Sequence, residues 1–178
     1  ANTLPGKYGI NANEYANNKL LKEVEIPAGV NSIGINAFAN SGLEKVTILG
    51  VPEIASGAFS NTPLKDLTLQ NAAAAGTYFK GMSTLAQLTL LSGTLPNQAF
   101  ANCANLKTIA IGPSVEMDYM KNSFSGTSYR IINVINDAKH PTLLGKEIWS
   151  TLVTSGYNTK TLLFDGNEPC FLLGTVRN

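Results

Sequence analysis

LKEVEIPAGVNSIGINAFANSG runs from Leu21 to Gly42, and LEKVTILGVPEIASGAFSNTP follows from Leu43 to Pro63 with the same pattern. Each copy begins with apolar residues at positions 0, +3 and +5, continues through glycine and proline, and then carries an isoleucine and an Ala-Phe pair. A pattern that recurs every 20 to 50 residues or so is typical of repeat architectures. The two copies therefore predict a repeat protein.

Three columns of apolar residues keep this period along most of the chain. The 0, +3, +5 pattern occurs at Leu21/Val24/Ile26, Leu43/Val46/Ile48, Leu64/Leu67/Leu69, Leu85/Leu88/Leu90, Leu106/Ile109/Ile111 and Tyr129/Ile132/Val134. An aromatic column consists of Tyr15, Phe38, Phe59, Phe79, Phe100 and Phe124. A third column, five residues before each aromatic, consists of Ile10, Ile33, Ile54, Ala74, Leu95 and Tyr119. Three columns with one period favour a solenoid of stacked coils.

Each repeat reads as a short strand, a turn and a return arm. The residues at +3 and +5 lie on one face of a strand, because side chains alternate between the two faces. Glycine and proline then turn the chain, and the arm brings the isoleucine and aromatic columns back against the strand. One coil alone buries too little apolar surface to offset the entropy of ordering its backbone. Only stacking on neighbouring coils closes the core.

The two ends of the chain differ from its middle, and we predict a single domain over residues 1–178. Residues 1–20 read as a half-repeat that caps the first strand, and residues 21–128 as five repeats. Residues 129–158 read as a longer repeat whose arm is a helix over 140–156, since HPTLLGKEIWSTLVTSG has one apolar helical face. Residues 159–178 read as a C-terminal cap. In it Thr159, Leu162 and Phe164 repeat the strand pattern, and CFLLGTV either closes the stack as a last strand or leads into a following domain.

Composition limits the classes of partner. Hydrophobic residues make up 44% of the 178 residues, charged residues only 14%, and the formal net charge is +1. A nearly neutral chain without basic clusters gives no reason to expect nucleic acid as a partner. No apolar run approaches the roughly 18 residues that span a bilayer. The chain shows no export signal at its start, which leaves the compartment open.

The two cysteines, Cys103 and Cys170, are too few for a disulfide framework and lie in no metal-binding spacing. We expect Cys103, in AFANCANL, to be a small buried side chain at a turn. A disulfide between Cys103 and Cys170 stays open, because only the structure can place the two within reach of each other.

The phrase LxxVxIPxGVxxIGxxAFxxS in the first repeat and AFANCANLKTIAI over 99–111 resemble the BspA-like leucine-rich repeats of bacterial surface proteins. The resemblance covers residues 10 to 134. It implies a leucine-rich-repeat solenoid: a right-handed β/α superhelix with a parallel sheet of short strands on one side and mostly irregular or short-helical arms. It also implies a surface location, adhesion or partner binding, and no catalysis. Two arms depart from the pattern, at Asn71–Ala75 and at Met117, Asp118 and Tyr119.

Residues that suggest catalysis are few. His140 is the only histidine, and no nucleophile motif accompanies it, so we interpret it as a solvated or capping residue. Glu23 and Glu25 project to the same face of a strand and superficially resemble a glycosidase carboxylate pair. We interpret them as solvated charges near Lys45 of the next coil. The sequence predicts no enzyme, no metal and no cofactor.

The outer face of the sheet carries the predicted binding residues, on a surface we expect to be concave. They flank the inward +3 residues: Glu23, Glu25, Lys45, Thr47, Asp66, Thr68, Gln87, Thr89, Thr108 and Asn133. Alternating charges and neighbouring threonines also stabilise a sheet by themselves. The sequence therefore supports two hypotheses. In the first, a non-catalytic cell-surface or secreted module binds a host or neighbouring-cell protein or glycan with this face. In the second, the chain is a structural spacer of a larger surface protein.

Overall fold

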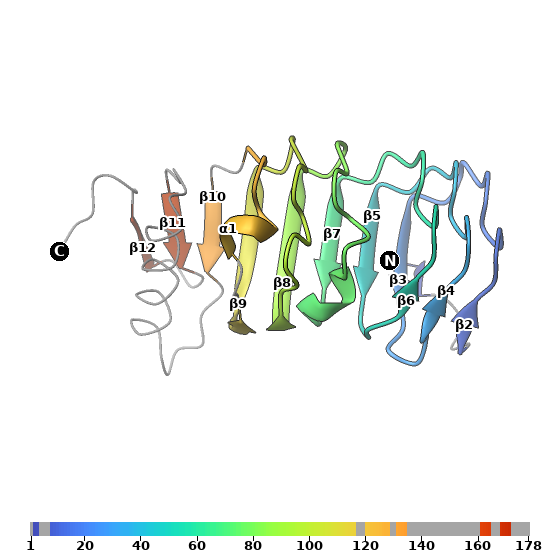
Figure 1. Cartoon of the computed structure of the whole chain (residues 1–178), viewed down its shortest axis with the longest axis horizontal. Coiled ribbons are helices and arrows are strands. Elements are labelled where there is room, and N and C mark those ends of the chain that lie inside the picture. The colour runs from blue at the N-terminus through green and yellow to red at the C-terminus, as the bar shows by residue number, and fades with distance from the viewer. Residues whose placement is uncertain are drawn as a thin grey trace.

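The chain forms a solenoid of stacked coils (Figure 1). A computed structural model describes residues 2–3, 8–116, 120–128, 131–134, 161–164 and 168–171. Side chains are described for residues 8–112, 114–116 and 122–128. We number the coils from the first leucine of each repeat: coil one is 21–42, coil two 43–63, coil three 64–84, coil four 85–105 and coil five 106–128.

One side of the solenoid is a nine-stranded sheet in the order β1-β3-β5-β7-β8-β9-β10-β11-β12. Its strands are β1 Asn2–Thr3, β3 Glu23–Ile26, β5 Lys45–Ile48, β7 Asp66–Leu69, β8 Gln87–Thr94, β9 Thr108–Glu116, β10 Ile131–Val134, β11 Thr161–Phe164 and β12 Glu168–Phe171. Neighbouring strands are parallel except β12, which pairs antiparallel with β11. From β3 to β9, each strand thus lies one coil beyond the previous one.

The strand register confirms the predicted apolar columns. The +3 residues pair across the sheet in the series Val24, Val46, Leu67, Leu88, Ile109 and Ile132. From Val24 to Ile109 their exposed fraction is 1% or less. A slip of one residue would turn a whole strand's apolar set to solvent, so this burial specifies the register.

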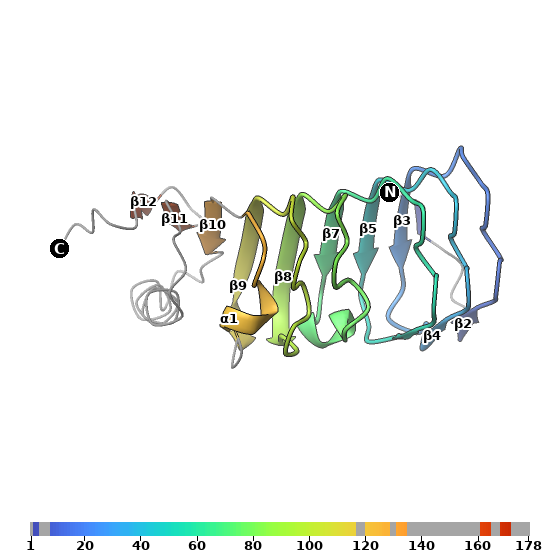
Figure 2. The same ribbon diagram turned by 45° about the horizontal axis from the view of Figure 1, so that its top comes forward.

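The aromatic column also forms a continuous stack inside the solenoid. Successive rings lie with their centroids 5.2 Å apart from Tyr15 to Phe38 and from Phe38 to Phe59. The spacing is then 6.0 Å to Phe79, 6.1 Å to Phe100 and 6.0 Å to Phe124. All five phenylalanines are buried, whereas Tyr15 at the end of the stack is half-buried. In Figure 2 the arms that carry this column lie in a layer facing the main sheet.

The arms differ along the molecule. A second parallel sheet, in the order β2-β4-β6, joins β2 Gly9–Ile10, β4 Ser32–Ile33 and β6 Glu53–Ile54. In coil three the corresponding segment is the 3₁₀ helix η1, Ala72–Ala75. In coils four and five, β8 and β9 continue past the corner. In coil five, a single helical turn, α1 Met120–Ser123, follows β9.

Backbone hydrogen bonds link the arms as well as the strands. In the first arm, Asn13, Tyr15 and Asn17 donate their N–H groups to carbonyls of coil one, at N···O distances of 3.0, 2.7 and 2.8 Å. Two residues after each aromatic, the backbone has positive φ, and asparagine or glycine stands there. These residues are Asn17, Asn40, Asn61, Gly81, Asn102 and Gly126. Asparagine and glycine tolerate this conformation better than other residues, which explains a recurrence that our sequence analysis did not identify.

The described strands near the two ends of the chain agree only in part with the predicted caps. The structure adds β1, which pairs Asn2 with Val24 and Thr3 with Glu25, to the half-repeat expected before residue 21. The predicted strand with Leu162 and Phe164 is confirmed, since these residues pair with Ile132 and Val134. The last strand begins at Glu168, two residues before the segment we expected. The predicted helix over 140–156 lies outside the described residues, and the right-handed superhelical path stays a prediction.

Candidate functional site

The strand register of the main sheet aligns the residues between the inward positions in two straight ladders. One ladder pairs Glu23, Lys45, Asp66, Gln87, Thr108 and Ile131 in register, and the other pairs Glu25, Thr47, Thr68, Thr89, Ala110 and Asn133. Parallel strands place successive members of a ladder about 4.8 Å apart. The structure therefore brings together the outer residues of β3 to β9 that the sequence predicts, and it places β10, with Asn133, next in the row.

The charged ladder contains an ion pair between coils. The Nζ of Lys45 lies 3.7 Å from Oε1 of Glu23, which confirms the predicted proximity of the two charges. Their side chains are 48% and 38% exposed, and such solvated pairs stabilise a fold by about 0–1 kcal/mol. Asp66 follows Lys45 in register. The ladder therefore presents anionic, cationic and neutral polar groups one coil apart.

The second ladder is dominated by threonine. Thr47, Thr68 and Thr89 are directly paired in register and are half-buried. Their β-branched side chains suit a strand, and each carries a hydroxyl that can both donate and accept a hydrogen bond. This row adds hydrogen-bonding capacity without charge.

The outer face of β3 to β9 is mainly polar. The row of these strands curves little in Figures 1 and 2. Among the outer positions of these described strands, no tyrosine or tryptophan is present. Such aromatic anchors dominate tight protein interfaces. The arrangement therefore suits a ligand recognised by several hydrogen bonds and charges.

The structure gives the glutamate pair no enclosed setting. Glu23 and Glu25 are half-exposed on the open sheet face, and Glu23 interacts with Lys45. His140 lies outside the described residues. Within the described part of the chain, no group of three or more His, Cys, Asp or Glu residues is placed to hold a metal ion. No helix in that part is long and apolar enough to cross a bilayer.

Cys103 is a free, buried thiol, as expected for a small core residue. Its Sγ donates a hydrogen bond to the carbonyl oxygen of Phe79, at 3.1 Å. Burial raises the pKa of this thiol above its ordinary value. A protonated, enclosed thiol is a poor nucleophile, so Cys103 serves packing.

A groove that sequence reasoning did not predict lies on the arm side, between coils two and three. It has a volume of about 500 Å³ and is lined by residues 51–54, Ser56 and residues 73–78. The signal in the sequence was the departure at Asn71–Ala75, where a run of alanines replaces the usual arm. That run predicted irregularity, but it did not indicate a hollow.

Comparison with known proteins supports the repeat family. A family model described as a BspA type leucine rich repeat region matches residues 9–131 in six copies. This range is close to the 10 to 134 over which the resemblance was noted. No curated protein and no solved structure matches the chain.

Proposed function

The chain belongs to the BspA-type leucine-rich repeat family, and on that premise we propose that it is a non-catalytic recognition module of a cell-surface or secreted protein. Its ligand is a protein or glycan of a host or neighbouring cell. The binding surface is the outer face of the main sheet, from β3 to β10. Members of such a repeat family serve in protein interaction or at surfaces, which agrees with a polar face and supports a binding role over catalysis.

The observation that carries the proposal is the difference between the two faces of the same strands. The inward +3 positions of β5, β7 and β8 hold the similar apolar residues Val46, Leu67 and Leu88. The outward neighbours in register are a cation, an anion and an amide, on Lys45, Asp66 and Gln87. The inward residues maintain the core, so the outer residues can vary without loss of the fold.

A binding test follows directly. The triple variant Lys45→Ala/Asp66→Ala/Gln87→Ala removes three distinct polar groups in register while leaving the core untouched. We expect saturable binding to an extracellular-matrix protein or a glycan by the unchanged chain, and a roughly tenfold or greater loss in the variant. The measurement is a binding screen against immobilised matrix proteins and a glycan array. Unchanged affinity in the triple variant would place the site elsewhere.

A control variant changes the same number of side chains to alanine, but away from the proposed binding face. Coil three offers three exposed residues that lie off the outer face: Lys80, Ser83 and Thr84. Changing all three to alanine should leave both folding and affinity unaltered. Circular dichroism of both variants separates loss of a ligand contact from loss of the solenoid.

The spacer alternative has its own support. The Lys45–Glu23 ion pair and the paired threonines stabilise a parallel sheet whether or not a ligand is present. If the outer face serves only this purpose, a well-folded chain binds none of the matrix proteins or glycans in the screen. That outcome would favour a structural spacer of a larger bacterial surface protein.

A further inference from the structure

The small sheet on the arm side ends abruptly at β6. Its order is β2-β4-β6, and each strand comes from a successive coil. Coil three does not supply a fourth strand, because the corresponding segment folds into η1. The side chain of Asn71 accepts a hydrogen bond from the N–H of Ala73, at 3.0 Å, and begins this helix. An Asx turn of this kind competes with strand pairing, so β6 keeps an uncovered edge.

The backbone groups on that edge are available for pairing. Toward β4, Glu53 and Ala55 donate their N–H groups to carbonyls of coil one, at 3.0 and 2.9 Å. Alternation along a strand turns the N–H and C=O of Ile54, which lies between them, to the opposite side. Within the described part of the chain, no residue forms a backbone hydrogen bond with Ile54 on that side. An open strand edge is a template for an added strand.

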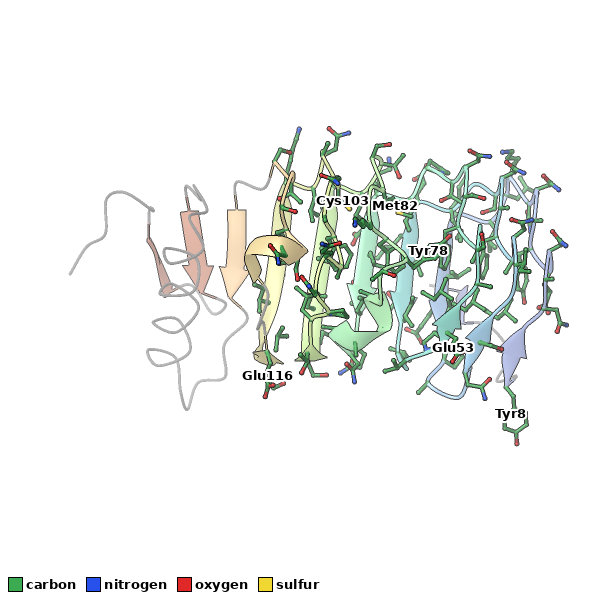
Figure 3. All side chains as sticks on the ribbon, in the orientation of Figure 1. Tyr8, Glu53, Tyr78, Met82, Cys103 and Glu116 are labelled. Atoms are coloured by element: carbon green, nitrogen blue, oxygen red, sulfur yellow. The ribbon has the colours of Figure 1, made fainter. Side chains whose placement is uncertain are left out.

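The groove between coils two and three lies along this edge. Its volume of about 500 Å³ is within the range of roughly 300–1,000 Å³ that is typical of ligand sites. Residues 51–54 form one wall, and Ala73, Ala74 and Ala75 contribute the short side chains of the other. Figure 3 shows the labelled Glu53 and Tyr78, which both line it. The groove therefore occupies the place beside β6 where a strand of coil three would otherwise lie.

Tyr78 holds the two coils in this arrangement. In coil one, the N–H of Phe38 donates to the carbonyl oxygen of Ala58, at 2.8 Å. In coil two, the equivalent N–H of Phe59 donates to the hydroxyl oxygen of Tyr78, at 2.6 Å. The Tyr78 ring also packs edge-on against Phe59, with centroids 5.8 Å apart. A side chain thus replaces the usual backbone link, and the groove is formed before any ligand binds.

The charge of the lining selects the occupant. Glu53 is the only charged residue that lines the groove. It is exposed, and within the described residues it forms no ion pair. The remaining lining is mainly apolar, including Val51, whose exposed fraction is 52%. A single carboxylate beside an apolar channel complements a cation that neighbours an apolar side chain.

We propose that this groove binds an extended segment of a partner protein, as a fourth strand added to β6. The segment alternates apolar and basic residues. Its backbone pairs with Ile54, an apolar side chain enters the space beside Ala73 to Ala75, and a lysine or arginine meets Glu53. The site lies on the arm side, so it is separate from the outer sheet face and does not depend on the function proposed for that face.

The test uses the whole chain, labelled with ¹⁵N, and the acetylated and amidated hexapeptide Lys-Val-Lys-Val-Lys-Val. We expect saturable amide shifts at residues 51–56 and 73–78, with a dissociation constant of about 0.1–1 mM for so small a contact. A peptide that is N-methylated at every residue has no backbone N–H to donate to the strand edge, and it should bind at least roughly tenfold more weakly. No saturable shift at these residues, or equal binding of the methylated peptide, would overturn the proposal.

Two variants test the site without disturbing the core. Glu53→Lys reverses an exposed charge, and it should weaken binding by roughly tenfold or more while favouring the acidic hexapeptide Glu-Val-Glu-Val-Glu-Val. Glu116→Lys makes the same change on the arm side of coil five and should leave affinity unchanged. Equal loss in both variants would indicate a general charge effect and overturn the site. Shifts confined to the strands β3 to β9 would also overturn it while supporting recognition by the outer face.

Discussion

Coils one and two bury their +3, +5 and aromatic residues as coils four and five do, but they turn their corners differently. In the first pair the main strand ends after four residues, and β4 or β6 forms a separate short strand. In the second pair, β8 and β9 run through the corner for eight and nine residues. The inward columns therefore define a coil, while the corner residues decide how its strand meets its arm.

The corner chemistry accounts for the two geometries. After β3, Pro27 presets its own φ and its carbonyl accepts the N–H of Val30, at 3.1 Å, which makes a tight turn. In β9 the register moves from Leu90–Ile111 to Ser92–Ser114. Gly112 and Pro113 together thus oppose Leu91 in a β-bulge. A bulge accommodates a proline inside a sheet because the missing N–H is not needed there.

Coil three lies between the coils with a tight corner and the coils with a long, continuous strand. It follows β6, the last strand of the small sheet, and precedes β8, the first long strand. Its own arm fits neither pattern and folds into η1. The groove beside β6 therefore arises where the two geometries meet.

The strongest destabilisation should come from the shared aromatic column, on which we expect both kinds of coil to depend equally. Phe38→Ala in coil one and Phe100→Ala in coil four each open a cavity at a fully buried position. We expect each to lower the free energy of unfolding by about 3–5 kcal/mol. Urea denaturation measures both losses, with half-buried Tyr15→Ala as the milder comparison. Tolerance of one substitution alone would show that the two kinds of coil have different cores.

A smaller loss of stability should distinguish the bulged corner of coil five from the tight corner of coil one. A Cβ at Gly112 would clash with the carbonyl oxygen of Leu91, whereas one at Gly29 would meet nothing within 4 Å. Gly112→Ala should therefore lower the free energy of unfolding by about 1–3 kcal/mol. Gly29→Ala should leave it unchanged or raise it by about 0.4–1 kcal/mol, because it restricts the unfolded chain. Equal effects in thermal or urea unfolding would contradict the distinction between a bulged and an open corner.

The smallest effect concerns the junction at coil three. Tyr78→Phe keeps the ring packing but removes the hydroxyl that accepts the N–H of Phe59. We expect a loss of about 1 kcal/mol in the free energy of unfolding, because that donor is left without its partner. Tyr8→Phe is the control, since Tyr8 is 86% exposed. Hydrogen exchange should also accelerate at the Phe59 amide, and unchanged exchange there would argue against the role of Tyr78 as a link between coils.

The coil, its period and its family all follow from the amino-acid sequence. The inward residues from Val24 to Ile109 and the aromatic column from Tyr15 to Phe124 follow from apolar spacing, because each coil must bury the same side of its strand. The outer ladders follow as well, since residues that flank an inward position point outward.

The way in which neighbouring coils join could not be predicted from apolar spacing. The edge at β6, the Tyr78 link and the bulge at Gly112 each depend on the groups that a neighbouring coil presents. The asparagines with positive φ likewise owe their conformation to arms that bond from one coil to the next. Apolar periodicity predicts which residues are buried within one coil. Hydrogen bonds and grooves between coils depend on the conformations of two segments at once, so the pattern of one segment does not predict them.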